Sequence, residues 1–451
     1  MKKILLIDPI YNPGTIPPNV PLSKLASGLM QCGYEISVID FVEPSCEGKK
    51  YDYFLDKEQN FINEIKKEAS DVDCVYITSG TGNELKPYPI FPRIRKICEA
   101  IKKEKNIMII VGGALINLYS IVYKLSKEDI CRTFIDELII GNEYYGTMNF
   151  LCEKPWPKSV VPSWDIWDMN KYPFYKSVQY NVGCPYSCDF CFEGKIYSPK
   201  SNLCTLDDFT KSISYGEKIV IEDSVLMSYQ NFDDIMTNIG AKNVRFAAYA
   251  RISEIIKNPD KVKRMKEAGC EALIIGIETL DSSMLKLHNK EIVSYQTRLG
   301  LDILKNNDMK VQGCFMLGFP KDSMENMERT IRFAIDEKLN GYRWHIYQPN
   351  YSNLGELLRI NGGKINVNEH FNVQLNVPDN CLNEIMLLQP ELGKLDEHFM
   401  IRGKEYISEQ VFENIGYLNS FTYKDIKKLI DEMFPKEWIL NEEILYEYLF
   451  K

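Results

Sequence analysis

Three cysteines stand close together at positions 184, 188 and 191, in the segment Gly183-Cys184-Pro185-Tyr186-Ser187-Cys188-Asp189-Phe190-Cys191. Thiolates are the ligands that zinc and iron–sulfur clusters prefer. A closed zinc site needs a fourth ligand, and no further Cys or His lies within about ten residues of the group. Three thiolates in one short segment therefore favour a 4Fe-4S cluster that keeps one iron open to an outside ligand. Such a cluster suits catalysis better than simple electron transfer.

The same spacing also describes one face of a helix, so a buried helix is the competing interpretation. Gly183, Pro185, Ser187 and Asp189 are poor residues for a helix interior. The segment also follows directly on a predicted strand. Both observations favour a metal-binding loop.

The remaining composition restricts the class of protein. The chain has 451 residues, a net charge of -9 and 13 cysteines, an odd number that makes a poor disulfide framework. The amino terminus lacks a signal-peptide core, and no run of about 18 apolar residues offers a membrane span. We expect a cytoplasmic protein in a reducing environment, without membrane attachment. The acidic balance argues against nucleic acid as a partner.

The elements around the cysteines alternate between strands and helices. In the first domain, residues 1–152, buried strands are predicted at Lys3–Asp8, Glu35–Asp40, Cys74–Thr78, Ile107–Gly113 and Leu138–Gly141. Helical spacing between them covers Leu22–Cys32, Phe54–Ala69 and Ile90–Lys105. This alternation predicts an α/β, Rossmann-like doubly wound domain with a parallel sheet, which binds ligands at the carboxyl ends of its strands.

Residues 153–176 form a linker rich in Pro and Trp, which we expect to pack against a domain. A second alternating series over residues 177–350 predicts a partial (β/α)6 barrel, because six units are too few for a full barrel. Its strands are expected at Ser177–Val182, Lys218–Asp223, Val244–Arg251, Ala272–Glu278, Val311–Gly318 and Tyr342–Tyr347. Residues 351–451 are expected to be a mostly helical extension that caps the barrel.

The triad after the first barrel strand resembles the radical S-adenosylmethionine (SAM) superfamily. In that family the open iron binds SAM, which is cleaved to a 5′-deoxyadenosyl radical. The resemblance implies that Cys184, Cys188 and Cys191 hold the cluster and that residues at the strand ends bind SAM. These SAM-binding candidates are Phe190, Asp223, Arg251, Gly276, Glu278 and Leu317. For each charged candidate, an ion pair that only supports the fold is the alternative role.

The order of doubly wound domain, linker and barrel resembles the cobalamin-binding subfamily of these enzymes over residues 1 to about 350. The matching pieces imply a cobalamin site at the strand ends of the first domain, formed by Thr78, Ser79, Gly80, Thr81, Gly112, Gly113, Gly141 and Glu143. The sequence has four histidines, all beyond residue 287, so this domain has no histidine to offer to cobalt. A scaffold that has lost its corrin is the alternative.

Candidates for catalysis are weak. His345 and Tyr347 fall on the predicted sixth strand, where core packing explains them as well as proton or hydrogen-atom transfer does. The resemblance implies a cobalamin-dependent radical SAM methyltransferase that acts on an unactivated carbon of a small natural product or a peptide. An electron donor such as flavodoxin or ferredoxin is implied as a partner.

Two other functions stay open. The first is a radical SAM enzyme that rearranges, cyclises or otherwise functionalises its substrate without methylation, since the fold does not fix the product. The second is a noncatalytic iron–sulfur protein for electron transfer or sensing, which would need a fourth cluster ligand.

Overall fold

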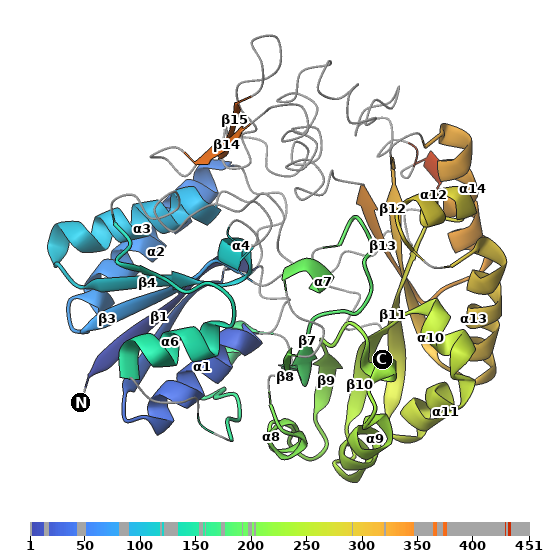
Figure 1. Ribbon diagram of the computed structural model, residues 1–451, viewed down its shortest axis with the longest axis horizontal. Coiled ribbons are helices and arrows are strands. Elements are labelled where there is room, and N and C mark those ends of the chain that lie inside the picture. The colour runs from blue at the N-terminus through green and yellow to red at the C-terminus, as the bar shows by residue number, and fades with distance from the viewer. Residues whose placement is uncertain are drawn as a thin grey trace. The chain divides into compact units, whose positions relative to one another are not determined.

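The computed structural model divides into two compact units, which we describe separately. The N-terminal unit comprises residues 1–173 with 351–411, and the barrel unit comprises residues 174–350 with 412–451. Figure 1 shows the elements of each. The structure describes residues 2–12, 18–42, 51–80, 90–117, 120, 134–152, 157, 159–172, 176–191, 193–196, 201–202, 204–290, 292–319, 322–346, 364–367, 373–376, 429 and 432–433.

The N-terminal unit contains a five-stranded parallel sheet in the order β2-β1-β3-β4-β5. Its strands are β1 (Lys3–Asn12), β2 (Glu35–Val42), β3 (Cys74–Thr78), β4 (Met108–Gly112) and β5 (Glu137–Leu138). Its helices are α1 (Val20–Gln31), α2 (Tyr51–Ala69), α3 (Ile90–Glu104), α4 (Ala114–Asn117) and α6 (Glu143–Cys152). The chain order turns back between β1 and β3, which is the point where doubly wound sheets bind ligands.

Helices cover both faces of this sheet, as a doubly wound fold requires. Helix α1 contacts α6, whereas α2 packs against α3. Every residue of β3 is buried, which explains its continuous run of apolar and β-branched residues. Helix α1 begins where the Asn19 side chain accepts a hydrogen bond from the Leu22 amide, 3.0 Å away, with Pro21 in the first turn. The predicted doubly wound fold is confirmed.

The later part of the Pro/Trp-rich segment packs on the N-terminal unit. The indole Nε1 of Trp167 donates to Ser23 Oγ of α1 at 2.8 Å, and the Ser163 amide donates to the Ser23 carbonyl at 3.1 Å. The hydroxyl of Tyr172 donates to Asp40 of β2. The tryptophan and tyrosine rings meet edge to face, 6.0 Å apart. The described residues 159–172 are thus structurally part of this unit.

The barrel unit is built on six parallel strands in the order β13-β12-β11-β10-β9-β6, so each strand lies beside the next along the chain. The strands are β6 (Lys176–Val178), β9 (Lys218–Ile221), β10 (Arg245–Ala250), β11 (Cys270–Glu278), β12 (Lys310–Leu317) and β13 (Gly341–Ile346). Helices on one face are α8 (Leu206–Lys211), α9 (Phe232–Ala241), α10 (Ile252–Lys257), α11 (Pro259–Glu267), α12 (Ser282–Leu287), α13 (Ser294–Asn306) and α14 (Met324–Asp336). The predicted partial (β/α)6 barrel is confirmed.

Side chains alternate between the two faces of this sheet. On the helix side, Phe246 and Ala248 of β10 join Leu273 and Ile275 of β11 in one large apolar core. The opposite face, here called the inner face, carries a separate small cluster formed by Val220, Ala247 and Ala272, with the ring of Tyr249 against it. The large core fixes the strands, and the inner face is left to bear the site.

Several predicted elements differ from the structure in their bounds. The strand predicted at Leu138–Gly141 is observed at Glu137–Leu138. The first barrel strand, predicted as Ser177–Val182, ends at Val178; β7 (Asn181–Val182) instead pairs antiparallel with β8 (Ser201–Asn202). Most of the extension 351–451 lies outside the described residues. Within it, β14 (Lys364–Val367) and β15 (Val373–Asn376) form an antiparallel pair, which the predicted helical extension does not include. Among the described residues, no helix combines the length and apolarity needed to span a membrane.

Candidate active site

The cluster loop runs from the end of β7 to α7 (Glu193–Ile196) and carries the three cysteines. Gly183 opens it at a φ of 96°, a conformation that glycine adopts without strain. Its amide donates to Glu193 Oε1 at 3.1 Å, which ties the start of the loop to its end. A Cβ on Gly194 would lie 2.5 Å from the Tyr186 carbonyl oxygen, so only glycine lets α7 approach the loop this closely.

The cysteine thiols lie close enough to influence the pKa of their neighbours. Burial raises the pKa of Cys191 to about 12 and also raises the pKa of Cys184, and the neighbouring cysteines raise both further. Among the described residues, no three His, Cys, Asp or Glu side chains are gathered tightly enough to hold a metal ion as they stand. What the loop supplies is the donor set: three soft sulfur ligands on one segment, as an iron–sulfur cluster requires.

Arg251 places a permanent positive charge beside this donor set. It follows the last residue of β10 and precedes α10, and its Nη1 donates to Cys188 Sγ at 3.4 Å. Its guanidinium stacks over the Tyr186 ring, 3.6 Å from the centroid. The Tyr186 hydroxyl in turn donates to Glu254 of α10. The predicted role of Arg251 was SAM binding; the structure places its charge on the cluster loop.

Asp223, also predicted to contact SAM, is instead enclosed by the protein. Its carboxylate accepts hydrogen bonds from the Tyr180 and Asn181 amides, both at 2.8 Å, and from the Tyr229 hydroxyl at 2.7 Å. Its side chain is fully buried, and burial raises its pKa to about 6 although these three bonds lower it. We therefore assign Asp223 to holding the turn between β6 and β7, just before the cluster loop.

Glu278 ends β11 and forms a buried ion pair with Lys290. The Nζ of Lys290 lies 2.6 Å from Glu278 Oε1 and donates to the Gly276 carbonyl at 2.9 Å. The two side chains are 9% and 7% exposed. Glu278 has a φ of 65°, which is unusual for a residue other than glycine and typical of functional sites. A Cβ on Gly276 would lie 2.3 Å from the Glu278 carboxylate, so glycine is required beneath this pair.

Phe190 lies among aromatic side chains at the same end of the sheet. Its ring is 6.0 Å from Phe319 and 6.4 Å from His288, and the Lys290 ammonium is 5.9 Å from its centroid. The Asp189 amide donates to the His288 carbonyl at 3.1 Å, and Asn289 Nδ2 donates to Asp189 Oδ1 at 2.8 Å. His288 and Asn289, which follow α12, therefore also hold the cluster loop through hydrogen bonds.

The structure gives less information on the other candidate residues of the barrel. Leu317, at the end of β12, packs into the core on the helix side, so only its backbone faces the strand ends. His345 lies on β13 opposite Met316, and its side chain lies outside the described part of the chain. Tyr347 lies outside the described residues altogether. The structure adds no support for either as a catalytic residue.

The strand ends of the N-terminal unit bring most of the remaining candidates together. Gly80 N donates to Thr78 Oγ1 at 3.3 Å, and the Ser79 amide donates to the Gly112 carbonyl at 2.7 Å. A Cβ on Gly113 would lie 2.9 Å from both the amide nitrogen and Oγ of Ser79, and Gly113 has a φ of 109°. These residues pack closely on one another where β3 and β4 end.

Gly141, after β5, is different because it is open. Its amide and carbonyl are both bonded to the Asn117 side chain, at 2.6 and 3.0 Å, and its φ is 89°. Yet a Cβ there would meet none of the described residues within 4 Å. Glu143 begins α6, but its side chain is outside the described part, as is the whole of Thr81.

Sequence reasoning did not single out several residues of this site. Lys290 is separated from Glu278 by all of α12, so no local pattern links them. Tyr186 stands inside the cysteine motif, but its contact with Arg251 depends on the return of the chain 65 positions later. In the N-terminal unit, Asn19 Nδ2 donates to the buried Asp8 carboxylate at 3.1 Å, beside the start of α1.

Comparisons with known proteins agree with this architecture. The profile of the radical SAM superfamily matches residues 178–334. An uncharacterized methyltransferase of Pyrococcus horikoshii is 24% identical over 378 residues, covering 74% of this chain and 78% of the relative. An anaerobic magnesium-protoporphyrin IX monomethyl ester cyclase of Rubrivivax gelatinosus is 23% identical over 42% of this chain, and the chain spans only 37% of that relative's length.

Solved structures extend the likeness to both units. The radical SAM methyltransferase TsrM of Kitasatospora setae, solved with tryptophan and a SAM analogue, is 12% identical, covers 99% of each chain and has a TM-score of 0.62. The same protein, solved with cobalamin and an iron–sulfur cluster, has a TM-score of 0.60. At this identity the likeness concerns the fold. The cysteine loop on a partial barrel, joined to the profile match, identifies residues 178–334 as a radical SAM domain and the chain as an enzyme.

Proposed function

We propose that the protein is a cobalamin-dependent radical SAM methyltransferase that methylates an unactivated carbon of a small natural product or a peptide. The observation that carries this proposal is the cluster loop with Arg251 at the carboxyl edge of the barrel sheet, in a chain whose N-terminal unit is doubly wound. The methyltransferase relative and the fold shared with TsrM support it.

Cys184, Cys188 and Cys191 fit a 4Fe-4S cluster by their chemistry, because they present three sulfur donors beside a guanidinium. Arg251 would offset the negative charge of thiolates and sulfide, and the closing bond from Gly183 to Glu193 would hold the loop in shape. When bound, the reduced cluster supplies the electron that cleaves SAM to a 5′-deoxyadenosyl radical, and cobalamin supplies a methyl group. Flavodoxin or ferredoxin would deliver that electron.

The SAM site would be formed by the residues at the ends of β11 and β12. Glu278 and Lys290 offer an anion and a cation within 2.6 Å of one another, which suits a ligand carrying both an ammonium and a carboxylate. Phe190 offers an apolar ring beside them for the adenine. Gly276 and the backbone of Leu317 allow a ligand to approach the strand ends closely.

The N-terminal unit fits a corrin through its open strand edge. Beside Gly141, no described residue occupies the space where a side chain would stand, whereas Ser79, Gly80, Gly112 and Gly113 form a compact turn. A flat macrocycle requires such a backbone edge without projecting side chains. Residues 1–152 would hold the corrin without a histidine of their own, since they contain none.

Anaerobic reconstitution tests the radical chemistry. The purified protein is loaded with iron and sulfide, reduced with dithionite and supplied with SAM, and 5′-deoxyadenosine is measured. We expect the wild type to form it and Cys188→Ala to fail. Cys32→Ala, at the end of α1, is the matched control and should behave as the wild type does. A wild type without product, or an active Cys188→Ala variant, would refute the proposal.

Cofactor content and label transfer test the remaining parts. Protein produced with added cobalamin should retain it through gel filtration. Gly141→Leu should lose it while keeping iron, since the substitution fills the open edge. With SAM carrying a labelled methyl group, an extract of the producing cells should yield a labelled small molecule or peptide. Retention of cobalamin by Gly141→Leu would show that the corrin does not lie at this edge.

A second function, ring formation without methyl transfer, is favoured by one observation. The cyclase of Rubrivivax gelatinosus matches this chain, although over a limited part of its own length. Under this alternative, 5′-deoxyadenosine forms but no labelled methyl group reaches the product. The label experiment therefore separates the two functions.

A further inference from the structure

Gln312 of β12 is a buried amide with no visible partner. It has 0% exposure, and neither its Nε2 nor its Oε1 has a hydrogen-bond partner among the described residues. An amide removed from water without replacement bonds destabilises a fold, which is why buried amides in native proteins nearly always have partners. A buried amide without a protein partner is satisfied in native structures by ordered water or by a bound ligand.

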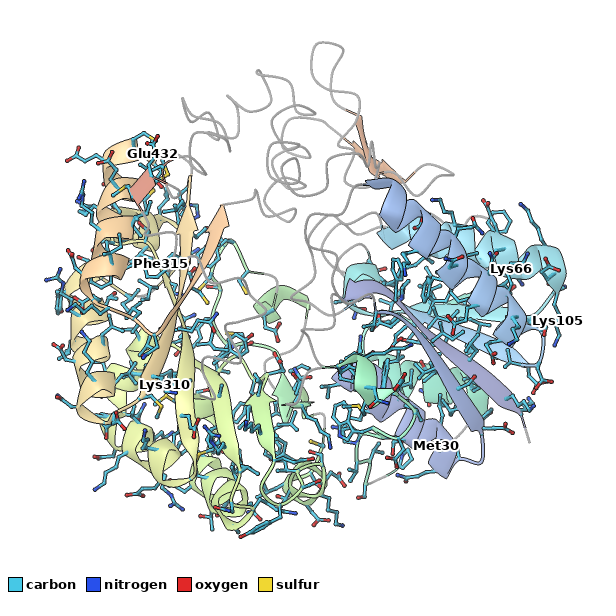
Figure 2. The ribbon with its side chains drawn as sticks, turned by 180° about the vertical axis from the view of Figure 1, so that it is seen from behind. Met30, Lys66, Lys105, Lys310, Phe315 and Glu432 are labelled. Atoms are coloured by element: carbon cyan, nitrogen blue, oxygen red, sulfur yellow. The ribbon has the colours of Figure 1, made fainter. Side chains whose placement is uncertain are left out.

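The side chain of Gln312 lies on the inner face. Its neighbours Val311 and Phe315 belong to the core on the helix side, and a Cβ built on Gly313 points at Leu339 in the same core. Because side chains alternate along a strand, Gln312 and Cys314 face the other way. Figure 2 shows the strand between its labelled residues Lys310 and Phe315.

The strand register places Gln312 on one level with three other inward residues. Tyr249 pairs with Ile274, and Ile274 pairs with Gln312. Glu222 extends the same row, because Ile221 pairs with Ala248 one position earlier. On the other side Gln312 pairs with Gly341, which has no side chain to satisfy the amide. We call this row, Glu222, Tyr249, Ile274 and Gln312, the polar row.

The residues two positions before and after the polar row on the inner face show how far it lies from the proposed SAM site. Two residues earlier on each strand lie Val220, Ala247 and Ala272, the small apolar cluster of the inner face. Two residues later on β11 lies Gly276, which pairs with Cys314 and lies beneath the Glu278–Lys290 pair. At about 3.3 Å per residue, the polar row is one step of roughly 7 Å from the proposed SAM level.

At the other end of the polar row, the Glu222 carboxylate is a hydrogen-bond acceptor with a fixed orientation. Ser177 Oγ of β6 donates to Glu222 Oε1 at 2.6 Å, which orients that carboxylate. The row therefore presents a carboxylate, the phenol of Tyr249, the apolar Ile274 and an amide whose NH2 group donates and whose oxygen accepts. A neutral ligand with hydrogen-bond donors suits this lining, whereas an anion is repelled by Glu222.

We propose that Gln312 binds an amide-type group of the substrate, namely a carboxamide, lactam or peptide unit, and so fixes substrate position and specificity. The amide of Gln312 is self-complementary to such a group, because each offers a donor next to an acceptor. This inference rests on the proposed function, since it takes the inner face beside the SAM level as the place of the substrate.

Binding of benzamide tests the proposal, with benzoate as the charged analogue and acetophenone as the analogue without a donor. Calorimetry is performed on the reconstituted protein with SAM under anaerobic conditions. Benzamide should bind the wild type and the exposed control Gln230→Met equally, and should bind Gln312→Met and Gln312→Leu about tenfold or more weakly. Benzoate and acetophenone should bind the wild type more weakly than benzamide does. Equal benzamide affinity in the wild type and Gln312→Met, or none in the wild type, would overturn the proposal.

Two further readouts separate the possible failures. The melting temperature of Gln312→Met should equal or exceed that of the wild type, because the substitution removes an unpartnered amide. A clear decrease in both Gln312 variants would show that Gln312 supports the fold and would overturn the proposal. 5′-Deoxyadenosine formation without substrate should be the same in the wild type and in the control Gln230→Met. Its absence from the wild type would contradict the proposed function, whereas its presence with unaltered benzamide binding would contradict only the role of Gln312.

Discussion

The ion pair between Glu278 and Lys290 should be essential to the barrel unit, and Lys290→Met tests this. The substitution keeps a chain of similar length but leaves the Glu278 carboxylate, 9% exposed, without its cation. It also removes the hydrogen bond to the Gly276 carbonyl. Breaking a buried pair from one side costs about 3–5 kcal/mol, because an uncompensated charge remains in the interior. The positive φ of Glu278 prevents easy relaxation of the backbone.

Hydrogen–deuterium exchange of peptides from β11 measures this loss as a lower free energy of opening. The double variant Glu278→Gln with Lys290→Met removes both charges and should recover most of the loss. Lys211→Met is the matched control, because the Lys211–Asp207 pair is 58% and 68% exposed and should contribute nothing measurable. A change below about 1 kcal/mol in Lys290→Met, or no recovery in the double variant, would refute the reasoning.

Three other predictions concern the groups around the site. Arg251→Gln removes a charge 3.4 Å from Cys188 Sγ, so the reduction potential of the cluster should fall by on the order of 100 mV. A redox titration followed by electron paramagnetic resonance measures this shift, and an unchanged potential would contradict the placement of that charge. For Asp223, the folded pKa of about 6 exceeds its ordinary value of 3.8, so its contribution to stability is fully present below about pH 4 and is lost as pH rises through 6. Urea unfolding of the apoprotein should show this slope, about 3 kcal/mol in total, and Asp223→Asn should abolish it; an equal slope in both would count against it. Gly113→Ala should lower the melting temperature of the N-terminal unit far more than Gly141→Ala, because its Cβ would meet Ser79 at 2.9 Å whereas that of Gly141 would meet no described residue within 4 Å; equal losses would mean that φ alone decides the cost.

The strands of both sheets could be predicted from the periodicity of the sequence. A strand buried on both faces gives a continuous apolar run, and a strand buried on one face gives strict alternation. Cys74–Thr78 is an example, since its five residues are all buried and its predicted bounds equal the observed ones. The prediction was wrong for Ser177–Val182, where Asp223, far along the chain, binds the amides of Tyr180 and Asn181 and turns the backbone out of the sheet. A side chain that distant leaves no local signal.

The candidate site, too, could be predicted only in part. The cysteine triad could be singled out because its three residues lie within eight positions of one another, and Glu278 because it ends a strand with a recognisable motif. Lys290, Tyr186 and Gln312 were not readable, since their importance comes from neighbours brought together by register and by loop return. Arg251 was found, but the group that it contacts was known only from the folded chain.

With the cluster held by Cys184, Cys188 and Cys191 as proposed, the contacts of the cluster loop would also determine when the protein acquires its metal. The cysteines are complete once residue 191 has been synthesised, but the groups that hold their loop come later: Asp223, then Arg251, then the His288 carbonyl and Asn289. About a hundred residues of translation therefore separate the ligands from their last support. During that interval the nascent thiols would lack these supporting contacts. Cluster insertion is consequently expected after the fourth barrel strand has left the ribosome, which makes maturation a late event in the life of the chain.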